Sequence, residues 1–109
     1  MINQLRIYEI FEDTQQAFLD RFRDQAARIM GRHGFRMQAM WLTRHNDEPA
    51  FAYLLAWESE AEMAEKWAAF MADQEWKDAK AASAGGPPLV GEITDYTLDP
   101  TDFSAAIAG

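Results

Sequence analysis

The chain has 109 residues, enough for one domain, and its lack of cysteine rules out disulfides and thiolate chemistry. Its net charge of −8, from 18 acidic and 10 basic side chains, disfavours binding to nucleic acid or to an anionic membrane surface. The sequence begins without the features of a signal peptide and holds no apolar run of the roughly 20 residues that span a bilayer, so we expect a cytoplasmic protein.

The first part of the chain predicts a strand, a helix and a second strand. Residues 3–10 alternate as a half-buried strand does, and we expect Arg6 and Tyr8 to point away from the helices. Residues 13–32 predict a helix, whose apolar side chains recur at helical spacing: Phe18, Phe22, Ala26, Ile29 and Met30. Gly34 stands where a left-handed C-terminal cap belongs, and residues 35–43 predict the second strand.

The second part of the chain predicts a hairpin, two more helices and a last strand. The turn-rich residues 44–49 lead into a third strand at residues 51–58. Ser59 and Glu62 form a capping box that opens the second helix, with an apolar stripe of Met63, Trp67, Phe70 and Met71. After it the sequence predicts a short helix at 74–83 capped by Asp73, a Gly-Pro connector at 85–88, a fourth strand at 89–98 and a tail at 99–109. We therefore expect a single domain with a core of residues 1–98.

This order of elements predicts an α+β, ferredoxin-like βαββαβ fold, an antiparallel sheet with both helices on one face. The third strand is apolar on both of its faces, which carry Phe51, Tyr53, Leu55 and Trp57 on one side and Ala52, Leu54 and Ala56 on the other. Because the helices cover only one face, the sequence predicts a homodimer in which a second copy of the sheet covers the other. The competing interpretation is that the tail and the 74–83 helix fold back over the open face.

Several segments resemble the NIPSNAP family. The sequence Leu5-Arg6-Ile7-Tyr8-Glu9-Ile10 is similar to the family's first strand, and Leu55-Ala56-Trp57-Glu58-Ser59 to the exit of its third strand. Asp73-Gln74-Glu75-Trp76 resembles an Asp-Pro-Glu-Trp motif, with Gln in place of Pro, and residues 98–104 resemble the C-terminal signature. The family also commonly has a Pro-Gly turn where this chain has Phe11-Glu12-Asp13. The resemblance implies a dimeric α/β barrel and leaves the biochemical role unassigned.

Arg6 and Tyr8 are the first candidate site residues, together with His33. Both side chains are expected to face the sheet-to-sheet interior or its rim, where Glu58 is a candidate carboxylate partner for Arg6. Arg6 and Tyr8 could there bind an anionic or phenolic ligand. The structural alternative is an interface salt bridge that fixes the register of the dimer. His33 suits acid–base catalysis by its residue type, but its place at the end of a helix predicts a capping role equally well.

The aromatic residues Trp41, Tyr53, Trp57 and Trp67 are candidates for lining a pocket between helices and sheet, although aromatic side chains at periodic positions also make an ordinary core. No spacing of residues predicts a metal site or a bound cofactor. The first functional hypothesis is a NIPSNAP-like protein that binds a small apolar or aromatic ligand. The alternatives are a cofactor-independent monooxygenase or isomerase acting on a small aromatic substrate, and a purely structural interaction module. A cavity of about 300 Å³ or more between sheet and helices, with two converging polar groups, would favour binding or catalysis, and a filled interior would favour the interaction module.

Overall fold

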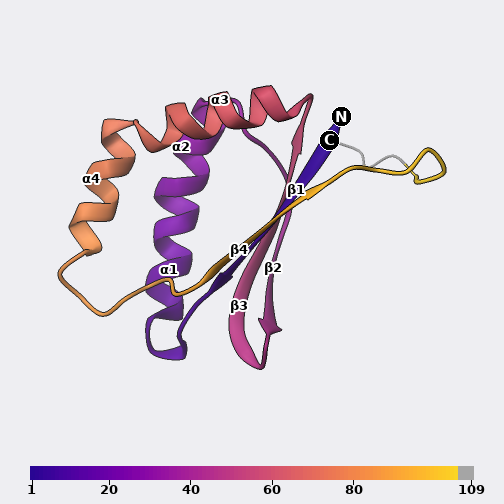
Figure 1. The fold of residues 1–109 in the computed structure, drawn as a ribbon. Helices are drawn as coiled ribbons and strands as arrows, with labels where there is room; N and C mark the ends of the chain where they lie inside the picture. The colour runs from indigo at the N-terminus through magenta and orange to yellow at the C-terminus, as the bar shows by residue number, and fades with distance from the viewer. Residues whose placement is uncertain (106–109) are drawn as a thin grey trace.

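The structure, a computed structural model, describes residues 1–105. Four strands form one antiparallel sheet in the order β2-β3-β1-β4, with bounds Ile2–Glu9 for β1, Arg36–His45 for β2, Glu48–Trp57 for β3 and Ile93–Leu98 for β4. The helices all lie on one side of this sheet (Figure 1). The predicted α+β, ferredoxin-like fold is therefore confirmed. Residues 106–109, the end of the predicted tail, lie outside the described residues.

The first crossover is a helix interrupted by a wider turn. A 3₁₀ turn at Glu12–Thr14 leads into α1, Gln15–Arg21, and a π-helical segment, Phe22–Ala26, joins α1 to α2, Ala27–Arg32. The predicted apolar stripe is confirmed, because Phe18, Phe22, Ala26, Ile29 and Met30 are all buried. Gly34 ends the helix with φ at 83°, in the left-handed region that glycine tolerates best.

The second crossover holds two helices, each capped by the side chain that the sequence predicts. In α3, Glu60–Met71, the Ser59 hydroxyl accepts a hydrogen bond from the Glu62 N–H at 3.1 Å. In α4, Gln74–Ser83, the Asp73 carboxylate accepts from two backbone N–H groups of the first turn. Both helices pack on the same side of the sheet as α1 and α2, so α4 does not cover the other face (Figure 1). No described helix has both the length and the hydrophobicity needed to cross a membrane.

The β2–β3 hairpin closes with a turn shorter than the predicted loop. Asn46 and Asp47 both have positive φ, at 53° and 63°, as a two-residue type I′ turn requires. The pairing of β2 with β3 shifts between Met37 and Ala39, which marks a β-bulge. The extra residue reverses the alternation, so Met37 faces the helices while Ala39 and Trp41 lie on the opposite face. Strict alternation along the strand would have placed these three side chains on one face.

The orientation predicted for β1 is wrong. Arg6 pairs with Tyr53 and Tyr8 with Phe51, and these partners point into the buried layer beneath the helices. Leu5 and Ile7 instead lie on the uncovered face, opposite Leu54 and Ala52. When both sets of alternating side chains in a strand are partly apolar, the pattern does not show which set faces the core. The orientation of β1 is therefore decided by its pairing with the neighbouring strands.

The uncovered face of the sheet is apolar across all four strands. Small residues of β3 lie at its centre, where Ala50, Ala52 and Ala56 are buried by their neighbours. Around them stand larger side chains that water reaches, among them Trp41 at 49%, Tyr96 at 47% and Leu98 at 41% exposure. The chain continues from β4 into a tail that runs out beyond the end of the sheet (Figure 1), where Phe103 is 87% exposed. Within the described residues, α4 lies on the helix side. The tail at 99–105 lies beside one end of this face, next to Asn3, Leu54 and Ala56, while Trp41 and Tyr96 remain exposed.

Candidate functional site

A cavity of about 280 Å³ lies between the helices and the sheet. Its walls are mostly apolar and buried, and they come from both crossovers: Phe18, Phe22, Ala26 and Met30 from the first, and Phe70 and Trp76 from the second. Met71 and Ile93, which are about half exposed, lie where the cavity opens to solvent. The π-helical segment contributes Phe22 and Ala26, and such segments are frequent at functional sites. This volume comes close to the size expected for a small-ligand site.

A hydrogen-bonded group centred on Arg6 forms the polar side of the cavity. The Arg6 guanidinium donates through Nη1 to Asp95 at 2.6 Å and through Nε to the Tyr53 hydroxyl at 3.0 Å. Its Nη2 donates to the Tyr8 hydroxyl at 3.2 Å, and the guanidinium lies over the Trp67 ring, 4.4 Å from the ring centroid. The hydroxyls of Tyr8 and Tyr53 are 2.6 Å apart. These contacts hold Arg6, Tyr8 and Trp67 rigidly in the cavity wall.

Gln4 extends this group beneath the helices. Its side chain is 3% exposed, and its Oε1 accepts hydrogen bonds from two indole N–H groups, that of Trp57 at 3.0 Å and that of Trp67 at 2.8 Å. Its Nε2 donates to the Asp95 carboxylate at 3.0 Å. One amide therefore connects β1, β3, β4 and α3, and it fixes the orientation of the Trp67 ring beside the cavity.

Burial and charge set the protonation of these groups. Burial raises the pKa of the Tyr53 phenol well above 10, so it stays neutral at physiological pH. Burial also opposes the charge on Arg6, but the Tyr8 and Tyr53 oxygens and Asp95 outweigh that effect and raise the pKa of Arg6 above its ordinary value. For Arg21, burial prevails and lowers the pKa. A guanidinium nevertheless remains charged at neutral pH.

The structure brings only some of the predicted residues to the cavity. Arg6, Tyr8 and Trp67 line it, and Tyr53 supports it through the two hydroxyl contacts. Trp57 is fully buried in the core beside Gln4. The partner predicted for Arg6 is wrong, because Glu58 pairs instead with Arg36 at 3.2 Å. Trp41 also departs from its prediction, since the β2 bulge turns it to the uncovered face of the sheet.

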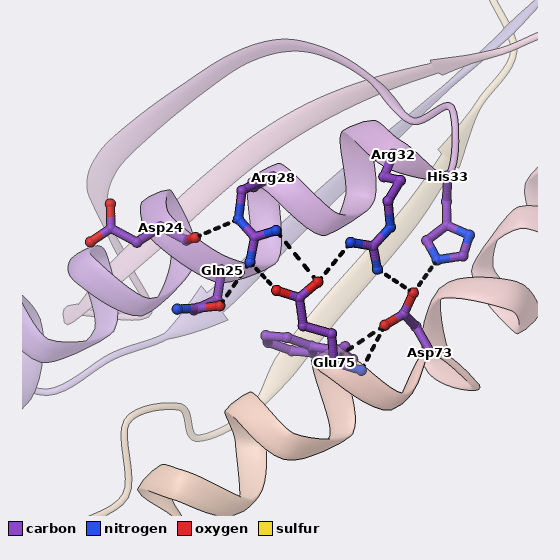
Figure 2. Close-up of polar contacts among 8 residues, drawn as sticks. Asp24, Gln25, Arg28, Arg32, His33, Asp73 and Glu75 are labelled. Carbon is purple, nitrogen blue, oxygen red and sulfur yellow. Dashed lines mark hydrogen bonds and ion pairs between the residues drawn. The ribbon is translucent and has the colours of Figure 1, made fainter.

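His33 belongs to a separate network that joins the two crossovers. Its Nε2 lies 2.7 Å from the Asp73 carboxylate, which Arg32 contacts at 2.6 Å. Arg32 and Arg28 both reach Glu75 in the first turn of α4 (Figure 2). His33 caps the C-terminus of α2 and contacts the residue that caps α4, so its contacts are those of a helix junction, away from the cavity. Within residues 1–105, no three His, Cys, Asp or Glu side chains gather closely enough to hold a metal ion.

Four polar residues of this region were not predicted from the sequence: Gln4, Arg21, Lys80 and Asp95. Each has a weak signal in the sequence. Gln4 shares the alternation of Arg6 and Tyr8, which places three polar groups on one side of β1. Arg21 follows Phe18 by three residues and Lys80 follows Trp76 by four, so each lies beside a buried ring on its helix. Asp95 on the edge strand could be identified only from the pairing register.

Comparison with known proteins places this fold. The NIPSNAP family model matches residues 3–105. An uncharacterized NIPSNAP domain protein from Burkholderia xenovorans is 17% identical, with a TM-score of 0.82 over 97% of this chain and 100% of that chain. A NIPSNAP family protein from Agrobacterium tumefaciens is 22% identical, with a TM-score of 0.81 over 94% and 95%. A monooxygenase from Streptomyces coelicolor, in complex with the ligand nanaomycin D, is 15% identical, with a TM-score of 0.61 over 99% and 92%. No curated protein matches.

Proposed function

The chain belongs to the NIPSNAP family, and on that premise we propose that it is a binding protein for a small apolar or aromatic ligand. The observation that carries this proposal is the cavity of about 280 Å³ beside Arg6 and Tyr8. Well-packed interiors rarely keep a space larger than a water molecule, so a cavity of this size calls for an occupant. Its wall of aromatic rings fits a flat apolar molecule, and the fixed polar groups on one side would orient it.

Filling the cavity tests this proposal. Isothermal titration calorimetry with 1-naphthalenemethanol, a neutral aromatic probe, should show saturable binding to the wild-type protein at one site per chain. The variant Ala26→Leu should lose most of this binding, because the added side-chain atoms occupy the cavity. The control Ala81→Leu makes the same change on α4 at an exposed position outside the cavity and should bind as the wild type does. Equal binding by all three proteins, or no binding by the wild type, would refute the proposal.

The homodimer is part of the same proposal. The uncovered face of the sheet is apolar and lies opposite the helices, so two copies could cover each other there and leave both cavities accessible. Native mass spectrometry of the purified protein would report the number of subunits and any retained ligand together. The cytoplasmic location likewise stays a proposal, which cell fractionation would test.

Catalysis is the second candidate function, as a cofactor-independent monooxygenase or isomerase acting on a small aromatic substrate. The observation in its favour is the pair of tyrosine hydroxyls 2.6 Å apart beside Arg6. In such a site Tyr8 would donate a proton and Arg6 would stabilise a developing oxyanion. Oxygen uptake with a dihydroxynaphthalene as substrate would test the monooxygenase. Turnover by the wild type that is lost in Tyr8→Phe would support it, whereas binding without turnover would favour the first function.

A further inference from the structure

We propose that the ligand of this cavity is an aromatic carboxylate, held by Arg21 and Lys80, an inference that rests on the proposed binding function. Among residues 1–105, three cationic side chains line the cavity, Arg6, Arg21 and Lys80, and no Asp or Glu does. This concentration of positive charge stands out in a chain whose net charge is −8. An apolar space with cations at its wall is complementary to a molecule with an apolar body and one anionic end.

The three cations differ in what already neutralises them. Arg6 has a carboxylate partner, Asp95, at 2.6 Å. Across residues 1–105, Arg21 and Lys80 take part in no ion pair. Arg21 donates to the Ser83 hydroxyl at 3.0 Å, and its guanidinium carbon lies 5.6 Å from the centroid of the Trp76 ring. The Lys80 ammonium lies 5.7 Å from the same centroid. Two half-buried cations thus lie near one buried indole, and neither is paired with a carboxylate of residues 1–105.

The acidic residues near Arg21 do not supply that anion. A groove between α1 and α4, on the outer side of Arg21, is lined by Asp20, Asp24, Glu75 and Asp78. Each of these carboxylates already has another partner. Asp20 and Asp24 bind Arg23, Glu75 binds Arg28 and Arg32, and Asp78 accepts a hydrogen bond from Gln74. The lowered pKa of Arg21 agrees with a buried charge that lacks full compensation.

The arrangement favours an aromatic acid over an aliphatic one. The cavity is walled by the rings of Phe18, Phe22, Phe70 and Trp76, which offer edge and face contacts to a flat body. Its volume of about 280 Å³ is at the small end for a ligand site, so the body would be about the size of a bicyclic ring. The carboxylate would then lie toward Arg21 and Lys80, where a guanidinium and an ammonium could both donate to it.

A matched pair of probes tests this inference by calorimetry. The compounds 1-naphthoate and 1-naphthalenemethanol share a ring system and differ in charge. We expect the wild-type protein to bind the acid about tenfold more tightly than the alcohol, as one charge-assisted hydrogen bond implies. Added salt should weaken binding of the acid and leave binding of the alcohol unchanged. The double variant Arg21→Gln, Lys80→Gln should bind both probes with the affinity of the alcohol. The control Lys77→Gln, an exposed position on α4 outside the cavity, should keep the preference.

The outcomes separate the two proposals. If the wild type binds acid and alcohol equally, or if the double variant keeps the preference, the carboxylate inference is refuted and the binding function stands. If neither probe binds, the binding function fails and the inference fails with it. Circular dichroism checks that each variant folds. Should the double variant not fold, the wild-type comparison of acid and alcohol and the single variant Lys80→Gln still decide the question.

Discussion

Gln4 shows how one buried polar residue positions the cavity wall. Its amide oxygen accepts from both Trp57 and Trp67, and its amide nitrogen donates to Asp95, which also pairs with Arg6. Every polar atom of this small network thereby has a partner, the condition under which burying polar groups is tolerated. Because Arg6 and Trp67 are both held in this way, the cavity has a rigid polar edge before any ligand arrives.

Replacing Gln4 with leucine should destabilise the protein strongly. Leucine has a similar size, but it leaves two indole N–H groups without an acceptor, at a cost of about 2–4 kcal/mol in the free energy of unfolding. Urea denaturation followed by tryptophan fluorescence would measure this change. The control Thr97→Val alters the exposed residue that pairs with Gln4 on β4 and should stay within about 0.5 kcal/mol of the wild type. A Gln4→Leu protein as stable as the control would contradict this account of the network.

At the scale of elements, the type and order of the helices and strands could be predicted from the sequence. Which side of β1 and of β2 faces the helices could not. Patterns within one segment identified the capped helices, the stripe from Phe18 to Met30 and the glycine cap at Gly34, because local chemistry determines each of them. The bulge in β2 and the direction of Arg6 depend on pairing between distant strands, which leaves no trace inside a single strand. The candidate site suffered from the same limit. Of the four aromatic residues predicted to line a pocket, only Trp67 lines this cavity, and Trp41 lies on the opposite face of the sheet because of the bulge.

The junction of α2 with α4 should make stability depend on pH in the acidic range. Hydrogen bonds from Arg28, and to a smaller extent from Arg32, lower the pKa of Glu75 from 4.5 to about 2. Contacts with His33 and Arg32 likewise hold the pKa of Asp73 well below its ordinary 3.8. Both carboxylates release their protons more readily in the folded chain than in the unfolded chain. Their stabilising contribution is therefore complete above about pH 5 and declines as the pH falls toward about 2.

The variant Glu75→Gln tests this dependence. It removes the charge that Arg28 and Arg32 bind, so the thermal unfolding midpoint should drop at pH 7 and should then change less than that of the wild type as the pH falls from about 5 to about 3. The control Glu65→Gln removes an exposed glutamate of α3 and should preserve the wild-type slope. Identical pH profiles for all three proteins would show that the junction contributes nothing to stability.

At the scale of the molecule, the cavity and the uncovered sheet face are apolar regions that suit different partners. The cavity on the helix side lies between the helices and the sheet, with cations at its wall, and suits a small molecule. The uncovered sheet face is open and broad, with Leu5, Leu54, Trp41 and Tyr96 among its side chains, and suits a surface of similar shape. In the proposed dimer, a second copy of the chain would supply such a surface, because a two-fold axis would bring the same face of both copies together. The two regions lie on opposite sides of the sheet, so dimer formation and ligand binding should be separable by substitution.

A charge at the centre of the uncovered face should dissociate the proposed dimer. Leu54 lies on the central strand β3 opposite Leu5, and Leu54→Glu would bury two like charges near the two-fold axis of the dimer. Sedimentation velocity should show a dimer for the wild type and a monomer for Leu54→Glu. The control Ala68→Glu introduces the same charge on the exposed side of α3 and should remain dimeric. If Leu54→Glu stays folded as a monomer and still binds 1-naphthalenemethanol, the two regions act independently. A wild-type monomer would refute the dimer.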